Sequence, residues 1–190
     1  VIATTVQSQD DEKIRALMCS DAIWYCGECM SCKTRCPRGN APGLLIMALR
    51  TLSQQMGYFT ESEKGRQQLA VKRMIGDQIL SSGYCVRPDA VDPAMHPEQG
   101  PVWEWEHKNL APVMEKLGAN YNGEGAGALR KVSDADLQEL KKIFEVTGGQ
   151  AMYDNIESFS KLKAEEMGLE FGTDINSEYV EHVYTANNQK

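Results

Sequence analysis

Four of the six cysteines in this chain lie within eleven residues, and a proline follows the last of them. They are Cys26, Cys29, Cys32 and Cys36, with Pro37 next. This C-x2-C-x2-C-x3-C-P order is typical of iron–sulfur sites, in which the first three thiolates bind one cluster and the fourth binds a neighbouring cluster. Three thiolates separated by two residues on a tight loop can face the same cluster. The spacing therefore predicts iron–sulfur binding in which Cys26, Cys29 and Cys32 share one cluster and Cys36 is a ligand of the same cluster or of a neighbouring one.

Other uses of cysteine fit the pattern less well. Zinc sites usually take two cysteine pairs from separate segments, and the second pair is missing here. Disulfides are not expected, because 190 residues can bury an adequate core without them and the N-terminus has no signal-peptide pattern. A thioredoxin-like C-x-x-C would need a βαβ pattern around it. We therefore expect reduced cysteines in a cytoplasmic protein.

The two remaining cysteines leave an alternative open. Cys19 lies upstream of the motif and Cys85 lies well downstream. Either could complete a cluster to which the motif gives only three thiolates. A free buried thiol is an equally good interpretation of each.

The residues that flank the motif also have two interpretations. Trp24 and Tyr25 could shield a cluster from water, or simply pack. Arg35 and Arg38, on either side of Cys36, could offset the negative charge of a thiolate-bound cluster. An ordinary solvated loop explains them equally well.

Charge and hydropathy limit the partners. The formal net charge of -7 and the pI of about 5.1 disfavour nucleic acid and anionic membrane surfaces. The longest apolar run, residues 44–49, is far below the roughly 20 residues that span a bilayer. We expect no direct membrane insertion, so any link to a membrane would run through another subunit.

Helices are expected to hold the cysteine motif. Asn40 can cap and Pro42 can open a helix that Gly57 ends, with apolar residues at helical spacing between them, namely Leu45, Ala48, Leu49, Leu52 and Met56. Thr60 and Glu63 resemble a capping box for a second helix, which closes near Gly83.

The rest of the chain is also predicted to be helical. Helices are expected over residues 103–117, with an interruption at Pro112, over 133–148 from a Ser133 cap, and over 152–168. Residues 87–101 are predicted to be an irregular connection, and the polar last twenty residues an arm that orders only on a partner. No segment alternates with period two, so the expected fold class is mainly α. We expect an iron–sulfur domain in residues 1–85 and a helical extension in 86–190.

The segment IWYCGECMSCKTRCPRGNAPGLLIMALRTLSQQMG, residues 23–57, resembles the second cluster motif of the heterodisulfide reductase C subunit family, which includes relatives in sulfur-oxidising bacteria. This resemblance rests on the tryptophan before the first cysteine, on the CPRG ending and on the ALR helix. The later segments LAPVMEKLG and IFEVTGG are also similar to that family. It implies an α-helical ferredoxin-like fold with two [4Fe-4S] clusters. By position, Cys26, Cys29 and Cys32 match the ligands of one cluster, and Cys36 matches the ligand of the other.

The chain departs from this family in one respect. The first four-cysteine motif should lie upstream of Cys19 and is missing. Either the N-terminus has been lost or this member has a single cluster. The chain also lacks any flavin motif and the double-cysteine signature of the family's catalytic B subunit, so we expect no catalysis by this chain alone.

The resemblance implies an electron-transfer subunit of a cytoplasmic heterodisulfide-reductase-like complex that acts in sulfur metabolism. Its partners would be the flavoprotein, or A, subunit of such a complex and its cysteine-rich catalytic B subunit. Within this hetero-oligomer, the present chain would hold one or two [4Fe-4S] clusters. The alternative is a structural or adaptor subunit whose zinc site folds the cysteine loop.

Overall fold

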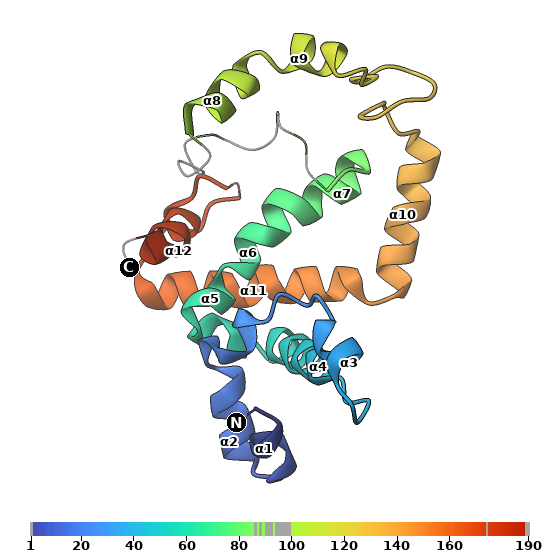
Figure 1. Cartoon of the computed structure of the whole chain (residues 1–190). Helices are drawn as coiled ribbons and strands as arrows, with labels where there is room; N and C mark the ends of the chain where they lie inside the picture. Colours follow the sequence, from blue (N-terminus) through green and yellow to red (C-terminus); the bar gives the residue numbers. More distant parts are fainter. Residues whose placement is uncertain are drawn as a thin grey trace. The chain divides into compact units, whose positions relative to one another are not determined.

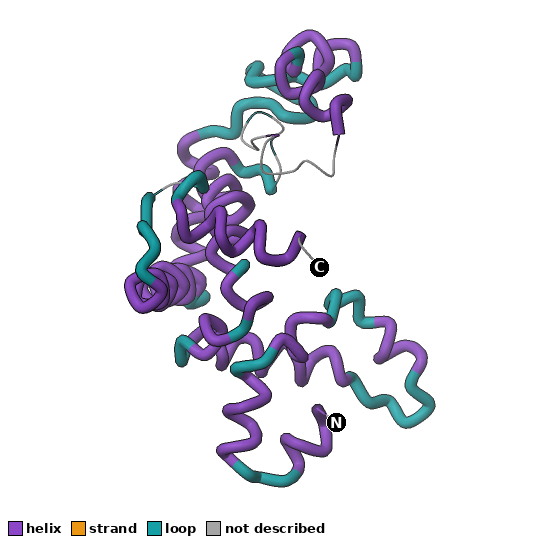
Figure 2. The backbone as a smooth tube through the Cα atoms, turned by 90° about the vertical axis from the view of Figure 1, so that its left-hand side faces the viewer, coloured by secondary structure: helices purple, strands orange, loops and turns teal. Residues whose placement is uncertain are grey.

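The computed structural model describes residues 2–85, 87, 89, 93, 100–173 and 175–188, and the side chains of 184–188 are not among what it describes. These residues form helices and turns with no strand, as Figure 2 shows. The predicted mainly-α class is confirmed, while its ferredoxin-like detail stays a prediction. Within these residues, each helix is too short or too polar to span a lipid bilayer.

The chain divides into two compact units. Unit 1 joins residues Val1–Ala70 with Ala151–Lys190, and unit 2 comprises Val71–Gln150. The predicted division at residue 85 stays a prediction, but the contacts group the chain differently, because the C-terminal helices pack with the first seventy residues.

The first part of unit 1 consists of short helices around a small core. Along the chain these are α1 (Ile2–Gln7), α2 (Asp11–Met18), the 3₁₀ turn η1 (Asp21–Tyr25), α3 (Ser31–Arg35), α4 (Pro42–Gln55), the 3₁₀ turn η2 (Tyr58–Glu61), α5 (Glu63–Arg66) and α6 (Gln68–Val71) (Figure 1). Leu17, Met18, Ile23 and Leu49 form the buried cluster that α2, η1 and α4 share.

Helix α4 confirms the helix that was predicted after the cysteines. Pro42 opens it, and Gly57 follows it in the left-handed conformation at φ 76°. The expected cap is wrong, since Ala41 and not Asn40 precedes the first turn. Of the expected apolar stripe only Leu49 is buried, while Leu52 and Met56 are 39% and 47% exposed.

The predicted second helix is present in pieces, and its start is different. Thr60 lies in η2, where its hydroxyl donates to the Gly57 carbonyl at 2.9 Å. Ser62 caps α5 instead, accepting the Gly65 N–H at 3.0 Å. A π-helical turn, η3 (Lys72–Gly76), interrupts the run before α7 (Asp77–Ser82), and Gly83 ends it as predicted.

The C-terminal part of unit 1 corrects the predicted arm. Helix α11 (Gly149–Met167) confirms the helix expected over 152–168. The last segment forms α12 (Glu178–Asn188), which packs against α5, and Tyr179, Val180 and Val183 are buried. A polar composition suggested disorder, but three apolar side chains are enough to hold this short helix against the unit.

Unit 2 contains the remaining helices, α8 (Gly100–Lys108), α9 (Leu110–Lys116) and α10 (Asp134–Val146). The break at Asn109 confirms the predicted interruption by Pro112, which lies in the first turn of α9. Ser133 caps α10 as predicted, accepting the Asp136 N–H at 3.1 Å.

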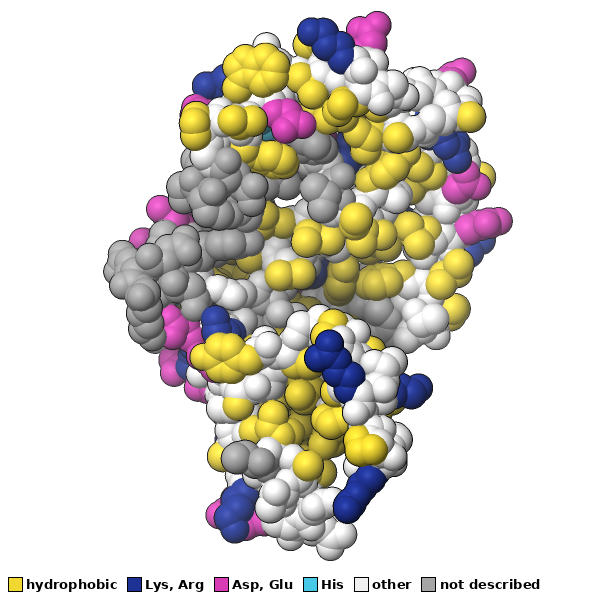
Figure 3. All heavy atoms as spheres, in the orientation of Figure 1, with side chains coloured by type: hydrophobic (Ala, Val, Ile, Leu, Met, Phe, Trp, Pro, Cys, Tyr) yellow, Lys and Arg dark blue, Asp and Glu magenta, His cyan; other side chains and the backbone are white. Residues whose placement is uncertain are grey.

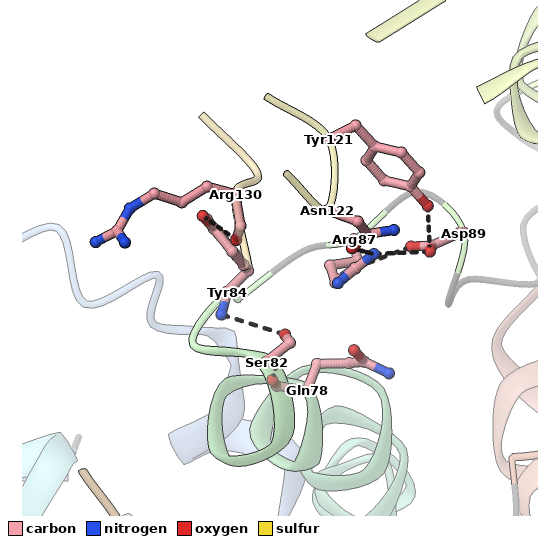
Figure 4. Close-up of polar contacts among 8 residues, drawn as sticks. All are labelled: Gln78, Ser82, Tyr84, Arg87, Asp89, Tyr121, Asn122 and Arg130. Atoms are coloured by element: carbon pink, nitrogen blue, oxygen red, sulfur yellow. Dashed lines mark hydrogen bonds and ion pairs between the residues drawn. The ribbon is translucent and has the colours of Figure 1, made fainter. Parts of the chain in front are cut away.

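Polar contacts fix two segments of unit 2 that lie far apart in sequence. Figure 4 shows Arg87 bridging Asp89 and Asn122, with the Tyr121 hydroxyl donating to Asp89. The Tyr84 hydroxyl donates to the Arg130 carbonyl at 2.9 Å. Most of the segment expected to be irregular lies outside the described residues, but Gly100 and Pro101 already belong to α8.

Candidate metal centre

The cysteine loop, residues 26–36, leaves η1 at Cys26 and ends with the short helix α3. Glu28 and Met30 have positive φ values of 54° and 56°. Residues other than glycine rarely adopt this left-handed conformation, and such strain gathers at functional sites. Two left-handed residues with a single residue between them turn the chain sharply between the first and third cysteines.

One arginine of α4 fixes the start of this loop. Arg50 Nε donates to the Ile23 carbonyl at 2.7 Å and Nη2 to the Cys26 carbonyl at 2.6 Å. Nη1 pairs with Glu28 Oε1 at 2.7 Å, and the guanidinium lies 5.2 Å from the centre of the Trp24 ring. The Arg50 side chain is only 16% exposed. A planar group with several donors can satisfy all these partners at once, which a lysine cannot do.

The first turn of α4 approaches the third cysteine closely. The Gly43 N–H donates to Cys32 Sγ over 3.4 Å. A Cβ atom at Gly43 would lie 3.3 Å from that sulfur and 3.2 Å from Met30 Sδ. Glycine therefore lets the backbone reach the thiol, and hydrogen bonds to ligand sulfurs are one means by which proteins tune iron–sulfur clusters.

The four cysteines of the motif are accessible to different degrees. Cys29 and Cys32 are exposed, while Cys26 and Cys36 are half-buried. Hydrogen bonding with the side chain and the backbone of Ser31 lowers the pKa of Cys29. A lower pKa favours the thiolate, which is the form that binds metal.

The structure brings these cysteines onto one loop, but it does not close them around a common centre. Among the residues with described placement, no three His, Cys, Asp or Glu side chains lie close enough to hold a metal ion as they stand. The ligand assignment therefore stays a prediction. The donor set still fits an iron–sulfur cluster, since it offers four thiols, a strained loop held by Arg50 and a backbone N–H directed at Cys32.

The other two cysteines lie in different places. Cys19 is half-buried beside an open cleft of about 310 Å³ in unit 1, and burial raises the pKa of its thiol. Cys85 is exposed in unit 2, just after α7. Neither has a contact that ties it to the cysteine loop among the described hydrogen bonds.

Arg50 and Gly43 were not predicted to belong to this site. The available signal for Arg50 was its position as the single charged residue in the apolar run of α4. Gly43 had no comparable signal, because a glycine directly after a helix-opening proline is unremarkable by itself.

Comparison with known proteins confirms the resemblance to C subunits of heterodisulfide reductases. The chain is 28% identical over 158 residues to the C subunit of the ferredoxin:CoB-CoM heterodisulfide reductase of Methanosarcina acetivorans, which covers 83% of this chain and 56% of that protein. It is 30% identical over 81 residues to the iron–sulfur C subunit of the CoB–CoM heterodisulfide reductase of Methanopyrus kandleri, 40% of this chain and 42% of that one. The chain thus spans about half the length of these relatives. No protein-family model and no solved structure matches it.

Proposed function

We propose that this chain is an iron–sulfur electron-transfer subunit of a heterodisulfide-reductase-like complex. The observation that carries the proposal is the four-cysteine loop, strained at two positions and held by Arg50. Cys26, Cys29 and Cys32 bind one [4Fe-4S] cluster, and Cys36 is a ligand of the same cluster or of a second one. The similarity to heterodisulfide reductase C subunits over most of the chain supports this assignment.

In this proposal a bound cluster supplies one-electron transfer, and the chain supplies its binding and environment. The cysteine thiolates hold the cluster, the Gly43 N–H stabilises charge on Cys32 Sγ, and Arg50 keeps the loop in place. No bond is made or broken in the chain itself: a donor is oxidised and an acceptor is reduced. The flavoprotein, or A, subunit is the proposed donor, and the cysteine-rich B subunit is the proposed acceptor, at which the disulfide is reduced. The proposed setting is sulfur metabolism in the cytoplasm.

The ligand assignment is tested by counting iron and acid-labile sulfide in anaerobically purified protein. We expect about four iron and four sulfide ions per cluster, and a broad visible absorption band that colours the protein brown. Cys29→Ser should lose most of the iron, because ligand loss also weakens the fold of the loop. Cys85→Ser is the matched control: it should keep its iron if the motif supplies the ligands, whereas a loss of iron would identify Cys85 as the residue that completes the cluster. Unchanged iron in Cys29→Ser would overturn the assignment, and a colourless, zinc-loaded protein would favour the adaptor alternative.

The role of Cys36 needs its own variant. Cys36→Ser should remove one of two reduced-state signals in low-temperature electron paramagnetic resonance if two clusters are bound, or the single signal if one is bound. An unchanged spectrum would show that Cys36 is a plain thiol.

The proposed partners are tested by purification from the native host. A flavoprotein and a cysteine-rich protein should copurify with this chain. Recovery of a monomer that reduces a disulfide without partners would contradict the proposal.

A further inference from the structure

Positive charge gathers in the segment that carries the cysteine loop. Residues 22–60 contain four basic residues and one acidic residue, a net charge of +3. Because the whole chain carries -7, the remaining residues together carry -10. This separation of charge was not evident from the composition alone.

Three of these basic side chains have no partner within the described chain. Arg50 is paired with Glu28, so its charge is used inside the loop. Lys33, Arg35 and Arg38 are exposed, and none of their side chains makes a hydrogen bond or ion pair to another described residue. They lie within six residues of one another and surround Cys36.

Exposed apolar side chains adjoin these cations. Helix α3, which carries Lys33 and Arg35, packs against α4. Leu44 and Met47, one turn apart near the start of α4, are 51% and 38% exposed. Figure 3 shows dark blue and yellow side chains side by side over α3 and α4. An apolar patch with a charged rim has the composition of a transient protein interface.

We propose that Lys33, Arg35, Arg38, Leu44 and Met47 form a docking face for an acidic redox protein. The inference rests on the proposed function, because it is the cysteine loop that makes this face the place where electrons enter or leave. Opposite charges across such a face speed association and orient the partner. Arginine side chains that are free of internal partners can bind the partner's carboxylates in bidentate fashion.

The alternative role for these cations is to offset the charge of a bound cluster. A group with that role acts by Coulomb attraction and shifts the reduction potential of the cluster, whereas a docking group changes the Kd for a partner. The side chains of Lys33, Arg35 and Arg38 are exposed, so water and salt would weaken their attraction to a cluster. A docking role therefore explains their exposure better.

A protein partner also fits better than nucleic acid. The residues outside the basic segment carry -10, which repels a long polyanion that runs past the face. A compact acidic partner covers only the basic face, and repulsion from more distant charges is screened beyond about 10 Å at ordinary salt.

The test uses the full-length protein with its cluster and a strongly acidic two-cluster bacterial ferredoxin as the probe. Calorimetry measures the Kd at about 20 mM and about 500 mM salt. Exposed charges interact over a long range at the lower salt concentration and over a short range at the higher one. Lys33→Glu/Arg35→Glu/Arg38→Glu is compared with the matched control Lys141→Glu/Lys142→Glu/Lys161→Glu. The control changes net charge equally at three other exposed lysines.

We expect the first variant to bind the probe at least tenfold more weakly at low salt and to lose most of the salt dependence, while the control changes Kd less than threefold. Lys33→Gln/Arg35→Gln/Arg38→Gln should give an intermediate loss with full iron content. Equal effects in the two charge-reversed variants would mean that only net charge matters, and would overturn the proposal.

Other outcomes are kept separate from the proposed function. Normal iron with an unchanged Kd, or a shifted reduction potential with an unchanged Kd, overturns the docking face alone. A cluster-free protein whose Kd still follows the predicted pattern supports the face and overturns the electron-transfer role. A dimer that the first variant disrupts, or tighter binding to single-stranded DNA than to the probe, assigns the face to another occupant and overturns the proposal.

Discussion

Arg50 does more for the cysteine loop than any other side chain in the described part of the chain. Its guanidinium holds two backbone carbonyls and one carboxylate, and it also lies over Trp24. The two carbonyls belong to residues before and at the start of the loop. The position of the first cysteine therefore depends on a residue 24 positions away.

Replacing Arg50 by lysine tests this dependence. Lysine keeps the charge but cannot make the three hydrogen bonds, so we expect a loss of about 2 kcal/mol in the free energy of unfolding. Iron occupancy should also fall. Urea unfolding followed by circular dichroism, together with iron counting, measures both effects. Arg38→Lys is the control and should change stability by less than about 0.5 kcal/mol, because Arg38 is exposed. Equal stability of the two variants would contradict the role of Arg50.

At this scale the sequence predicts the donors but not what holds them. The spacing of the four cysteines and the following proline indicates a cluster site directly. The bonds from Arg50 and the Gly43 N–H to the loop depend on how α4 lies against it. Such contacts join residues that are far apart in sequence, so no local sequence pattern predicts them.

At the scale of elements, close packing at Gly65 joins α5 to the residues before it. A Cβ atom at this position would lie 2.2 Å from the Phe59 carbonyl oxygen and 3.0 Å from Trp24 Nε1. The carbonyl belongs to the backbone of η2 and cannot move aside as a flexible side chain can. The glycine is therefore required by space, since its own φ is not positive.

Gly65→Ala should consequently destabilise unit 1. We expect a loss of about 2 to 3 kcal/mol, the usual cost of overpacking a tight site. Thermal unfolding followed by circular dichroism measures it. Gly27→Ala is the control, because no atom lies within 4 Å of a Cβ atom at that glycine. A similar melting temperature for the two variants would show that η2 and α5 can separate without cost.

Helical spacing predicted the long elements well and the short ones poorly. Pro42 and Gly57 bound α4, and Ser133 begins α10, because caps and breakers act locally. The π-helical turn at residues 72–76 has no such local signal. Helix α12 was not predicted, because its three buried apolar residues are buried only when the helix packs against the rest of unit 1, including α5, and the local sequence does not show that contact.

At the scale of the whole molecule, unit 1 is built from both ends of the chain. Tyr179, on α12, is fully buried within it. Burial raises the pKa of Tyr179 to about 12, since the charged phenolate would lose its hydration. The neutral phenol is thus the form that the folded unit accepts.

This burial predicts a loss of stability at alkaline pH. An unfolded tyrosine titrates near 10, so the contribution of the neutral phenol is fully present below about pH 10 and is lost as the pH rises towards 12. The effect is about 2 to 3 kcal/mol. Urea unfolding between pH 8 and about pH 11.5 should therefore show a steeper decline for the native protein than for Tyr179→Phe. Parallel declines would show that Tyr179 ionises without opening the unit. At neutral pH the variant should be nearly as stable as the native protein, because the buried hydroxyl makes no hydrogen bond of ordinary geometry to a described residue, although Ser160 lies close to it.

The grouping of the chain into units was beyond the reach of sequence reasoning. A division near residue 85 follows from the position of the cysteine motif and the proline-rich segment after it. The observed unit 1 instead returns to residues 151–190 after eighty intervening residues. Nothing in the composition of α11 or α12 indicates which earlier helices they contact.

This discontinuity also governs the order of events during synthesis. The cysteine loop leaves the ribosome early, whereas α12, which packs against α5, is translated more than a hundred residues later. Domains generally fold as units once their residues have emerged. Unit 1 therefore completes its core only after unit 2 has been made, and until then the thiols of the nascent loop belong to an unfinished fold that is open to oxidation. Insertion of the proposed cluster would then be a late step, for which the early cysteines must stay reduced until the last helices have been made.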